Sequence, residues 1–211
     1  SSAASDVYKR QVPHISDEAL RLLQQEFCEK LSDPARMLGG NFLYTSDIFF
    51  DPEFINKIAS VFARKFKDSE ADYVATVETK GIPLAASVAH LLNLPLVIIR
   101  REAKVSEGST LSINYFSGSY DRIQRMSMSK RAMRPGSKVL IIDDFMRGGG
   151  SISGITEIVG EFNGAVVGVG VAIAGVEPKK KKIEDYTSIV FLGEIDEEKR
   201  TISILPNSDI F

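Results

Sequence analysis

Several features that mark other protein classes are scarce in this chain of 211 residues. Its single cysteine, Cys28, lies in a helical pattern of apolar residues, which excludes a disulfide framework and a thiolate metal site. No apolar run is long enough to cross a membrane, and the N-terminus lacks the apolar core of a signal peptide. We therefore expect a cytoplasmic protein without a membrane partner.

An excess of charge of one sign is also missing. The formal net charge is −2 and the pI is about 5.8, so the chain as a whole does not attract nucleic acid or an acidic membrane. Its length suits one large domain that buries roughly 70% of the surface of the unfolded chain. Residues 1–11 are polar and aperiodic, and we expect a disordered tail or an artefact there, followed by one domain over residues 12–211.

Helices are expected in the first third of the chain. Ser16 precedes an apolar series at three- and four-residue spacing, which predicts a capped helix to about Leu31. A turn is expected at residues 39–41. Asp51 and Pro52 are typical of a helix start, because the aspartate can cap the helix and the proline fits its first turn.

From residue 73 onward, aliphatic strands alternate with helices. Unalternating aliphatic strands separated by helices imply a mostly parallel sheet covered on both faces, so the expected class is α/β. A closing antiparallel pair is expected around the acidic turn DEEK. The sequence predicts parallel strands at residues 73–77, 95–100, 138–143 and 165–174, and helices at residues 82–92 and 151–162.

Residues 103–136 interrupt this alternation. One strand is conceivable at residues 111–116, and a loop of this length inside a compact domain is usually functional or mobile. Its end carries five cations without an acid, which fit a solvated loop, a lid over ligand phosphates or a basic face that supports DNA binding. These cations are Arg122, Arg125, Lys130, Arg131 and Arg134. The lysines of residues 179–182 are interpreted as a solvated turn.

The segment VLIIDDFMRGGGS, residues 139–151, combines a buried strand, two carboxylates and three glycines. In an open parallel sheet, ligands bind outside the carboxyl ends of the strands, and glycines bring backbone N–H groups to an anion at a helix N-terminus. The carboxylates of Asp143 and Asp144 can accept hydrogen bonds from the 2′- and 3′-hydroxyls of a ribose. The segment therefore predicts a ribose-phosphate site. The alternative is that the two acids cap the helix and the glycines form an ordinary turn.

Other residues could complete such a site. Residues 79–81 (Thr-Lys-Gly) follow a strand and open a helix, so they can hold a pyrophosphate or form a plain turn. Arg147 could grip a phosphate with its guanidinium fork. Phe145 fits either the site or the core. The segment is not a Walker loop, because it contains no G-x-x-x-x-G-K-[ST] motif. It is not a dinucleotide-binding fingerprint either, because its carboxylates precede its glycines.

Four aliphatic residues, two acids, two variable residues, a glycine pair and a hydroxyl residue are similar to the phosphoribosyl-pyrophosphate (PRPP) signature of type I phosphoribosyltransferases. More narrowly, the chain resembles the effector domain of the purine operon repressor family of Gram-positive bacteria over roughly residues 12–211. The segments that carry this resemblance are VETKGIPLAASVA, VIIRREAKVSEGSTLSINYFSGSYDRIQRMSMSKR and DDFMRGGGSISG.

The resemblance implies a type I phosphoribosyltransferase-like fold with a small hood and a flexible loop. It further implies a homodimer that binds PRPP as a signal without turnover, and for which guanosine tetraphosphate or pentaphosphate competes. No cofactor is required, although Mg²⁺ could accompany PRPP. The family has a winged-helix DNA-binding domain before this one. The short segment before Ser16 leaves no room for it, so DNA binding is expected only if a full-length protein supplies that domain.

The resemblance also implies residue roles. The residues expected to bind PRPP are Asp143, Asp144, Phe145, Met146, Arg147, Gly148, Gly149, Gly150 and Ser151. Those expected at the pyrophosphate are Thr79, Lys80, Gly81, Arg101 and Lys104. Phe42 matches a position where the family carries an aromatic ring that stacks on the guanine of the alarmone, with Phe145 as the second ring. No catalytic residue and no metal ligand are expected.

Two other functions remain open. The same site would serve an active purine or xanthine phosphoribosyltransferase, in which a base attacks C1 of the ribose. The chain could also be a regulatory subunit that joins a separate DNA-binding chain. The flanking segments, above all SEGSTLSINYFSGS, favour the sensor.

Overall fold

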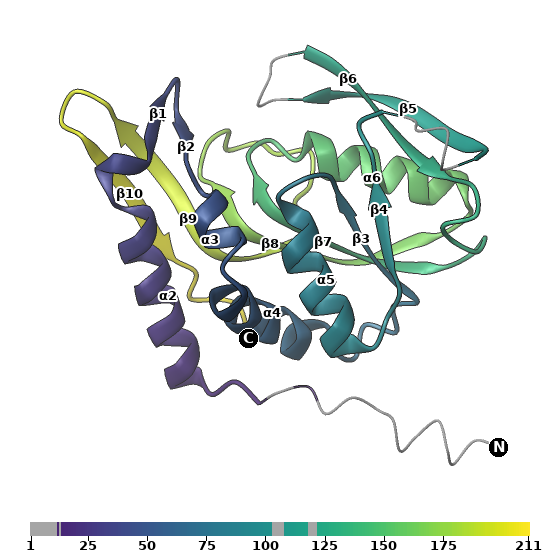
Figure 1. Ribbon diagram of the computed structural model, residues 1–211, viewed down its shortest axis with the longest axis horizontal. Helices are drawn as coiled ribbons and strands as arrows, with labels where there is room; N and C mark the ends of the chain where they lie inside the picture. The colour runs from purple at the N-terminus through teal and green to yellow at the C-terminus, as the bar shows by residue number, and fades with distance from the viewer. Residues whose placement is uncertain (1–11, 13, 103–107, 118–121) are drawn as a thin grey trace.

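The computed structural model describes residues 12, 14–102, 108–117 and 122–211, and its centre is a six-stranded sheet (Figure 1). The strand order is β10-β9-β8-β7-β3-β4. Strands β4, β3, β7, β8 and β9 are parallel, whereas β10 pairs with β9 in the antiparallel sense. The bounds are Tyr73–Val77 (β3), Leu96–Ile99 (β4), Lys138–Met146 (β7), Ala165–Gly175 (β8), Thr187–Asp196 (β9) and Thr201–Pro206 (β10). The predicted α/β class is confirmed.

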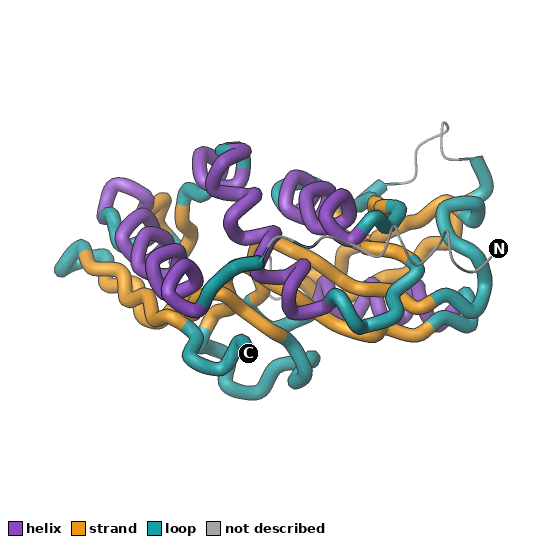
Figure 2. The backbone as a smooth tube through the Cα atoms, turned by 90° about the horizontal axis from the view of Figure 1, so that it is seen from below, coloured by secondary structure: helices purple, strands orange, loops and turns teal. Residues whose placement is uncertain are grey.

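Helices cover both faces of the sheet, above and below the strands (Figure 2). Within β7, Leu140 and Ile142 pack into the core on one face, and Val139 and Ile141 into the core on the other. This burial of successive residues is why the strands are aliphatic without alternation. One face carries Asp17–Leu31 (α2), Ser46–Phe49 (α3), Pro52–Phe66 (α4) and Gly81–Leu92 (α5), and the other carries Gly150–Glu161 (α6).

The expected helix starts are present. Ser16 Oγ accepts a hydrogen bond from the N–H of Ala19 at 3.1 Å at the start of α2. The Asp51 carboxylate accepts from the N–H of Glu53 at 3.0 Å, with Pro52 in the first turn of α4. Among the described residues, no helix is long and apolar enough to span a bilayer.

A small hairpin stands at one end of the sheet and forms the hood. Its strands are Met37–Gly39 (β1) and Phe42–Leu43 (β2), joined through Gly40 and Asn41 at φ of 59° and 63°. Below it, the guanidinium of Arg36 forms a bidentate ion pair with Asp47, at 2.7 and 2.9 Å. This pair ties the residue before the hairpin to α3.

The interpretation of residues 122–134 as one basic loop is wrong. Thr110–Ser117 (β5) and Arg122–Ser129 (β6) form an antiparallel hairpin that packs over α6. Arg122 and Arg125 therefore lie on a strand, and the other three cations lie beyond its end. All five are exposed. The apolar signal of β6 is weak because its buried positions are methionines and a serine. Residues 1–11 and Lys104 lie outside the described residues.

Candidate functional site

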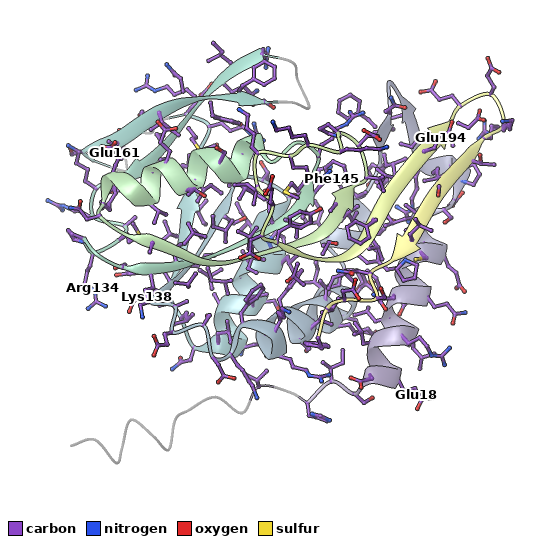
Figure 3. The ribbon with its side chains drawn as sticks, turned by 180° about the vertical axis from the view of Figure 1, so that it is seen from behind. Glu18, Arg134, Lys138, Phe145, Glu161 and Glu194 are labelled. Carbon is purple, nitrogen blue, oxygen red and sulfur yellow. The ribbon has the colours of Figure 1, made fainter. Side chains whose placement is uncertain are left out.

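A cavity of about 310 Å³ opens at the carboxyl ends of β3, β4 and β7 and is covered on one side by the hood. Figure 3 labels Phe145 at this edge of the sheet. The cavity brings together predicted site residues from four separate segments, because parallel strands end at the same edge. Those that line it are Phe42, Thr79, Lys80, Arg101, Asp143, Asp144, Phe145, Arg147 and Ser151.

The two acids at the end of β7 lie in unlike positions. Asp143 is buried, and its Oδ1 accepts a hydrogen bond from the N–H of Asp144 at 2.9 Å. Burial, followed by the neighbouring charge of Asp144, raises the pKa of Asp143 well above its ordinary value, and Arg101 partly offsets the rise. Burial also raises the pKa of Asp144, against the opposing effects of its hydrogen bond with Asp143 and of Lys80. Both acids line the cavity, where the hydroxyls of a ligand can donate hydrogen bonds to their carboxylates.

Gly81 allows α5 to begin directly against this acid pair. A Cβ at Gly81 would lie 2.5 Å from Oγ1 of Thr76 and closer still to Oδ1 of Asp143. A real side chain cannot fit there. The Thr76 hydroxyl is buried and has no hydrogen-bond partner among the described residues. Gly81 thus packs against Asp143 and helps to fix its position, but it does not line the cavity itself.

The glycine loop connects β7 to the N-terminus of α6. Gly149 has a φ of 79°, and a Cβ there would meet the backbone N of Ile183 at 3.2 Å. The carbonyl of Gly148 accepts a hydrogen bond from the N–H of Lys182 at 2.9 Å. The segment that follows β8 therefore packs closely on the loop. Arg147 and Ser151 line the cavity, whereas the predicted site residues Gly148, Gly149 and Gly150 between them do not. Met146 was expected to bind PRPP, but its side chain is buried in the core with residues of α6 and does not line the cavity.

Three cationic residues line the cavity together with the acid pair. The ammonium of Lys80 lies 3.4 Å from Oγ1 of Thr45, at the foot of the hood. The backbone N–H of Arg101 donates to Oε1 of Glu78 at 2.8 Å, which joins the loops after β3 and β4. Arg147 also lines the cavity. Glu78, Thr45 and Thr76 were not predicted, since each is a common residue type at a strand or turn end.

Two aromatic side chains complete the lining. Phe42 comes from the hood and remains 45% exposed, and Phe145 comes from β7 and is partly buried. A second cavity of about 480 Å³ adjoins the first and shares Phe145 and Arg147 with it. Around this cavity lie carboxylates that can accept from hydroxyls, an anion-binding loop, cations and two aromatic rings. This combination suits a phosphorylated ribose, with room for a larger group.

Comparisons with known proteins agree with this arrangement. Residues 45–200 match the family described as phosphoribosyl transferase domain. The chain is 42% identical over 193 residues to the purine biosynthesis transcriptional repressor PurR of Bacillus subtilis, over 92% of this chain and 68% of that protein. It is 31% identical over 163 residues to a xanthine phosphoribosyltransferase of Laribacter hongkongensis, over 74% of this chain and 86% of that protein.

A solved structure shows the same fold. The adenine phosphoribosyltransferase of Saccharomyces cerevisiae superposes with a TM-score of 0.67 at 21% identity, over 80% of this chain and 98% of that chain. At this identity the likeness establishes the fold alone. The expected type I phosphoribosyltransferase-like fold is confirmed.

Proposed function

This chain belongs to the phosphoribosyl transferase domain family, and within it to the purine biosynthesis transcriptional regulators, and from that premise we propose that it is a sensor for PRPP. The observation that carries the proposal is the convergence of the acid pair, of Arg147 and Ser151 on either side of the glycines, and of two cationic loops on one cavity. The acid pair would accept hydrogen bonds from the ribose hydroxyls, and the glycine loop would bind the 5-phosphate. Lys80 and Arg101 would face the pyrophosphate. If Mg²⁺ accompanies PRPP, it would offset the negative charge of the pyrophosphate.

Guanosine tetraphosphate is the proposed competitor. It shares phosphates and a ribose with PRPP, and it also carries a base that PRPP lacks. Phe42 and Phe145 line the same cavity from two different elements and could hold that base between their rings. The adjoining cavity offers space for the larger ligand.

In this proposal the domain works in the cytoplasm as a homodimer and senses the effector. DNA contact would require a winged-helix domain of the full-length regulator. The effector would thus set the affinity of the regulator for DNA through differential binding to its conformations.

Displacement calorimetry tests the shared site. Guanosine tetraphosphate is titrated into the protein alone and into the protein saturated with PRPP. The proposal predicts that saturation with PRPP strongly weakens the apparent affinity for the second ligand. Simultaneous binding of both ligands would contradict it.

The second candidate is an active purine phosphoribosyltransferase, and the 31% identity to a xanthine phosphoribosyltransferase favours it. Incubation of the protein with PRPP, Mg²⁺ and adenine, guanine, hypoxanthine or xanthine separates the two functions. The sensor is expected to form no nucleotide. Turnover at or above about 1 per second, the low end of ordinary enzymes, would establish the enzyme instead.

A further inference from the structure

Arg101 is the centre of a hydrogen-bond network that joins the candidate site to the β5–β6 hairpin. Its backbone N–H is held by Glu78, as described above. Its side chain contacts the hairpin, where Nη1 donates to Oε1 of Gln124 at 2.7 Å and to the hydroxyl of Tyr115 at 3.0 Å. Arg101 also lines the cavity, so this one residue borders both the site and the hairpin.

Tyr115 and Gln124 form a preorganised pair. They lie directly opposite each other on β5 and β6, and the Tyr115 hydroxyl donates to Oε1 of Gln124 at 2.9 Å. The Tyr115 side chain is 6% exposed and packs closely against α6, where a Cβ at Gly154 would lie 3.3 Å from Cβ of Tyr115. The two acceptors are therefore fixed by the packing of the hairpin before any ligand arrives.

The hairpin is itself tied to the end of β4. Arg100 and Ser127 exchange two backbone hydrogen bonds, at 2.9 and 2.7 Å. This bridge sits directly before Arg101 in the chain. It fixes the position of β6 relative to the end of β4, and thus the position of Gln124 relative to the Arg101 guanidinium.

This step rests on the proposed function: we infer that Tyr115 and Gln124 are positioning residues that hold the Arg101 guanidinium toward the pyrophosphate of PRPP. A free arginine side chain samples many rotamers, and ordering it on binding costs affinity. Two acceptors that fix it beforehand remove part of that cost. Both are neutral, so they orient the guanidinium without cancelling the charge that attracts the phosphates.

Two ligands separate this role from general support of the fold. PRPP carries the pyrophosphate, whereas ribose 5-phosphate lacks it and should not need Arg101. Calorimetry with both ligands is therefore performed on the wild type, on Gln124→Met, which keeps the side-chain length but loses the acceptor, and on Tyr115→Phe, which loses only the hydroxyl. Gln25→Met, at an exposed position on α2, is the matched control.

We expect Gln124→Met to weaken PRPP about tenfold, the loss typical of one hydrogen bond to a charged group, and Tyr115→Phe to weaken it less. Binding of ribose 5-phosphate should stay unchanged in both variants, which also reports that the site is folded. Arg101→Ala should weaken PRPP, and adding Gln124→Met to it should cause little further loss, because Gln124 acts through Arg101.

Several outcomes would overturn the inference while leaving the proposed function intact. These are an unchanged PRPP affinity in Gln124→Met, an equal loss for both ligands, or full additivity with Arg101→Ala. If the wild type failed to bind PRPP at all, the proposed function itself would be wrong.

Discussion

Replacing Gly81 with alanine should disturb the acid pair from behind. The new Cβ would lie 2.5 Å from Oγ1 of Thr76 and closer still to Oδ1 of Asp143, well inside the 3.4–4 Å of ordinary contact. Neither neighbour can move into solvent, since Thr76 is 0% exposed and Asp143 is 4% exposed. Something in the site must shift.

The expected cost follows from that overlap. Overpacking a close-packed site costs about 1–3 kcal/mol. The gain in helix propensity from glycine to alanine is at most about 1 kcal/mol and is smaller at a first helical position. We expect Gly81→Ala to lower the free energy of unfolding by about 1–2 kcal/mol, and each kcal/mol lowers Tm by about 2–4 °C in a domain of this size. PRPP should bind at least about tenfold more weakly, because losing one hydrogen bond to the displaced Asp143 costs at least this much.

Gly160→Ala is the matched control. Gly160 lies in α6, and a Cβ there would meet nothing within 4 Å. This variant should be as stable as the wild type or slightly more stable, with unchanged PRPP affinity. Thermal unfolding followed by circular dichroism, and calorimetry with PRPP, measure both effects. If Gly81→Ala matched Gly160→Ala in both measurements, the close contact between Gly81 and the acid pair would be wrong.

Two further predictions concern single side chains of the cavity. Asp143→Asn should raise the Tm of the unliganded protein at neutral pH. Because the pKa of Asp143 is raised in the folded protein, stability is lost as the pH rises from the ordinary aspartate pKa through the folded-state pKa. A neutral amide avoids this loss, and it should also weaken the binding of PRPP. An unchanged pH dependence of Tm in this variant would contradict the assigned cause. Phe42→Ala should weaken guanosine tetraphosphate about tenfold, since stacking contributes about 0.5–1.5 kcal/mol per ring, and should leave PRPP nearly unaffected; equal weakening of both ligands would assign Phe42 to the fold.

Much of the fold could be predicted because burial leaves a clear pattern in the sequence. The strands of the sheet are aliphatic on both faces, and α2 and α4 carry capping residues and an apolar stripe. Of the β5–β6 hairpin, a strand at β5 was considered and β6 was missed, because only one face of the hairpin packs on α6 and its buried positions are partly polar. The strands of the hood, of three and two residues, leave too short a pattern to detect.

The site was predictable to the extent that it is contiguous in sequence. The acid pair and the glycine loop lie within one strand-loop-helix segment, so their chemistry could be interpreted directly. The burial of Asp143 could not, because it depends on the close approach of Gly81 from another strand end. Tyr115 and Gln124 were missed for the same reason, since their contact with Arg101 exists only after the hairpin has folded over the sheet.

Calorimetric titration of PRPP into the wild type and into Asp143→Ala/Asp144→Ala tests the central claim most directly. Each carboxylate that accepts a ribose hydroxyl contributes about 1.5–3 kcal/mol to the interaction. The account predicts saturable binding by the wild type and no measurable binding by the double variant, with both proteins folded by circular dichroism. Equal affinity of the two proteins for PRPP, or no binding by the wild type, would contradict it.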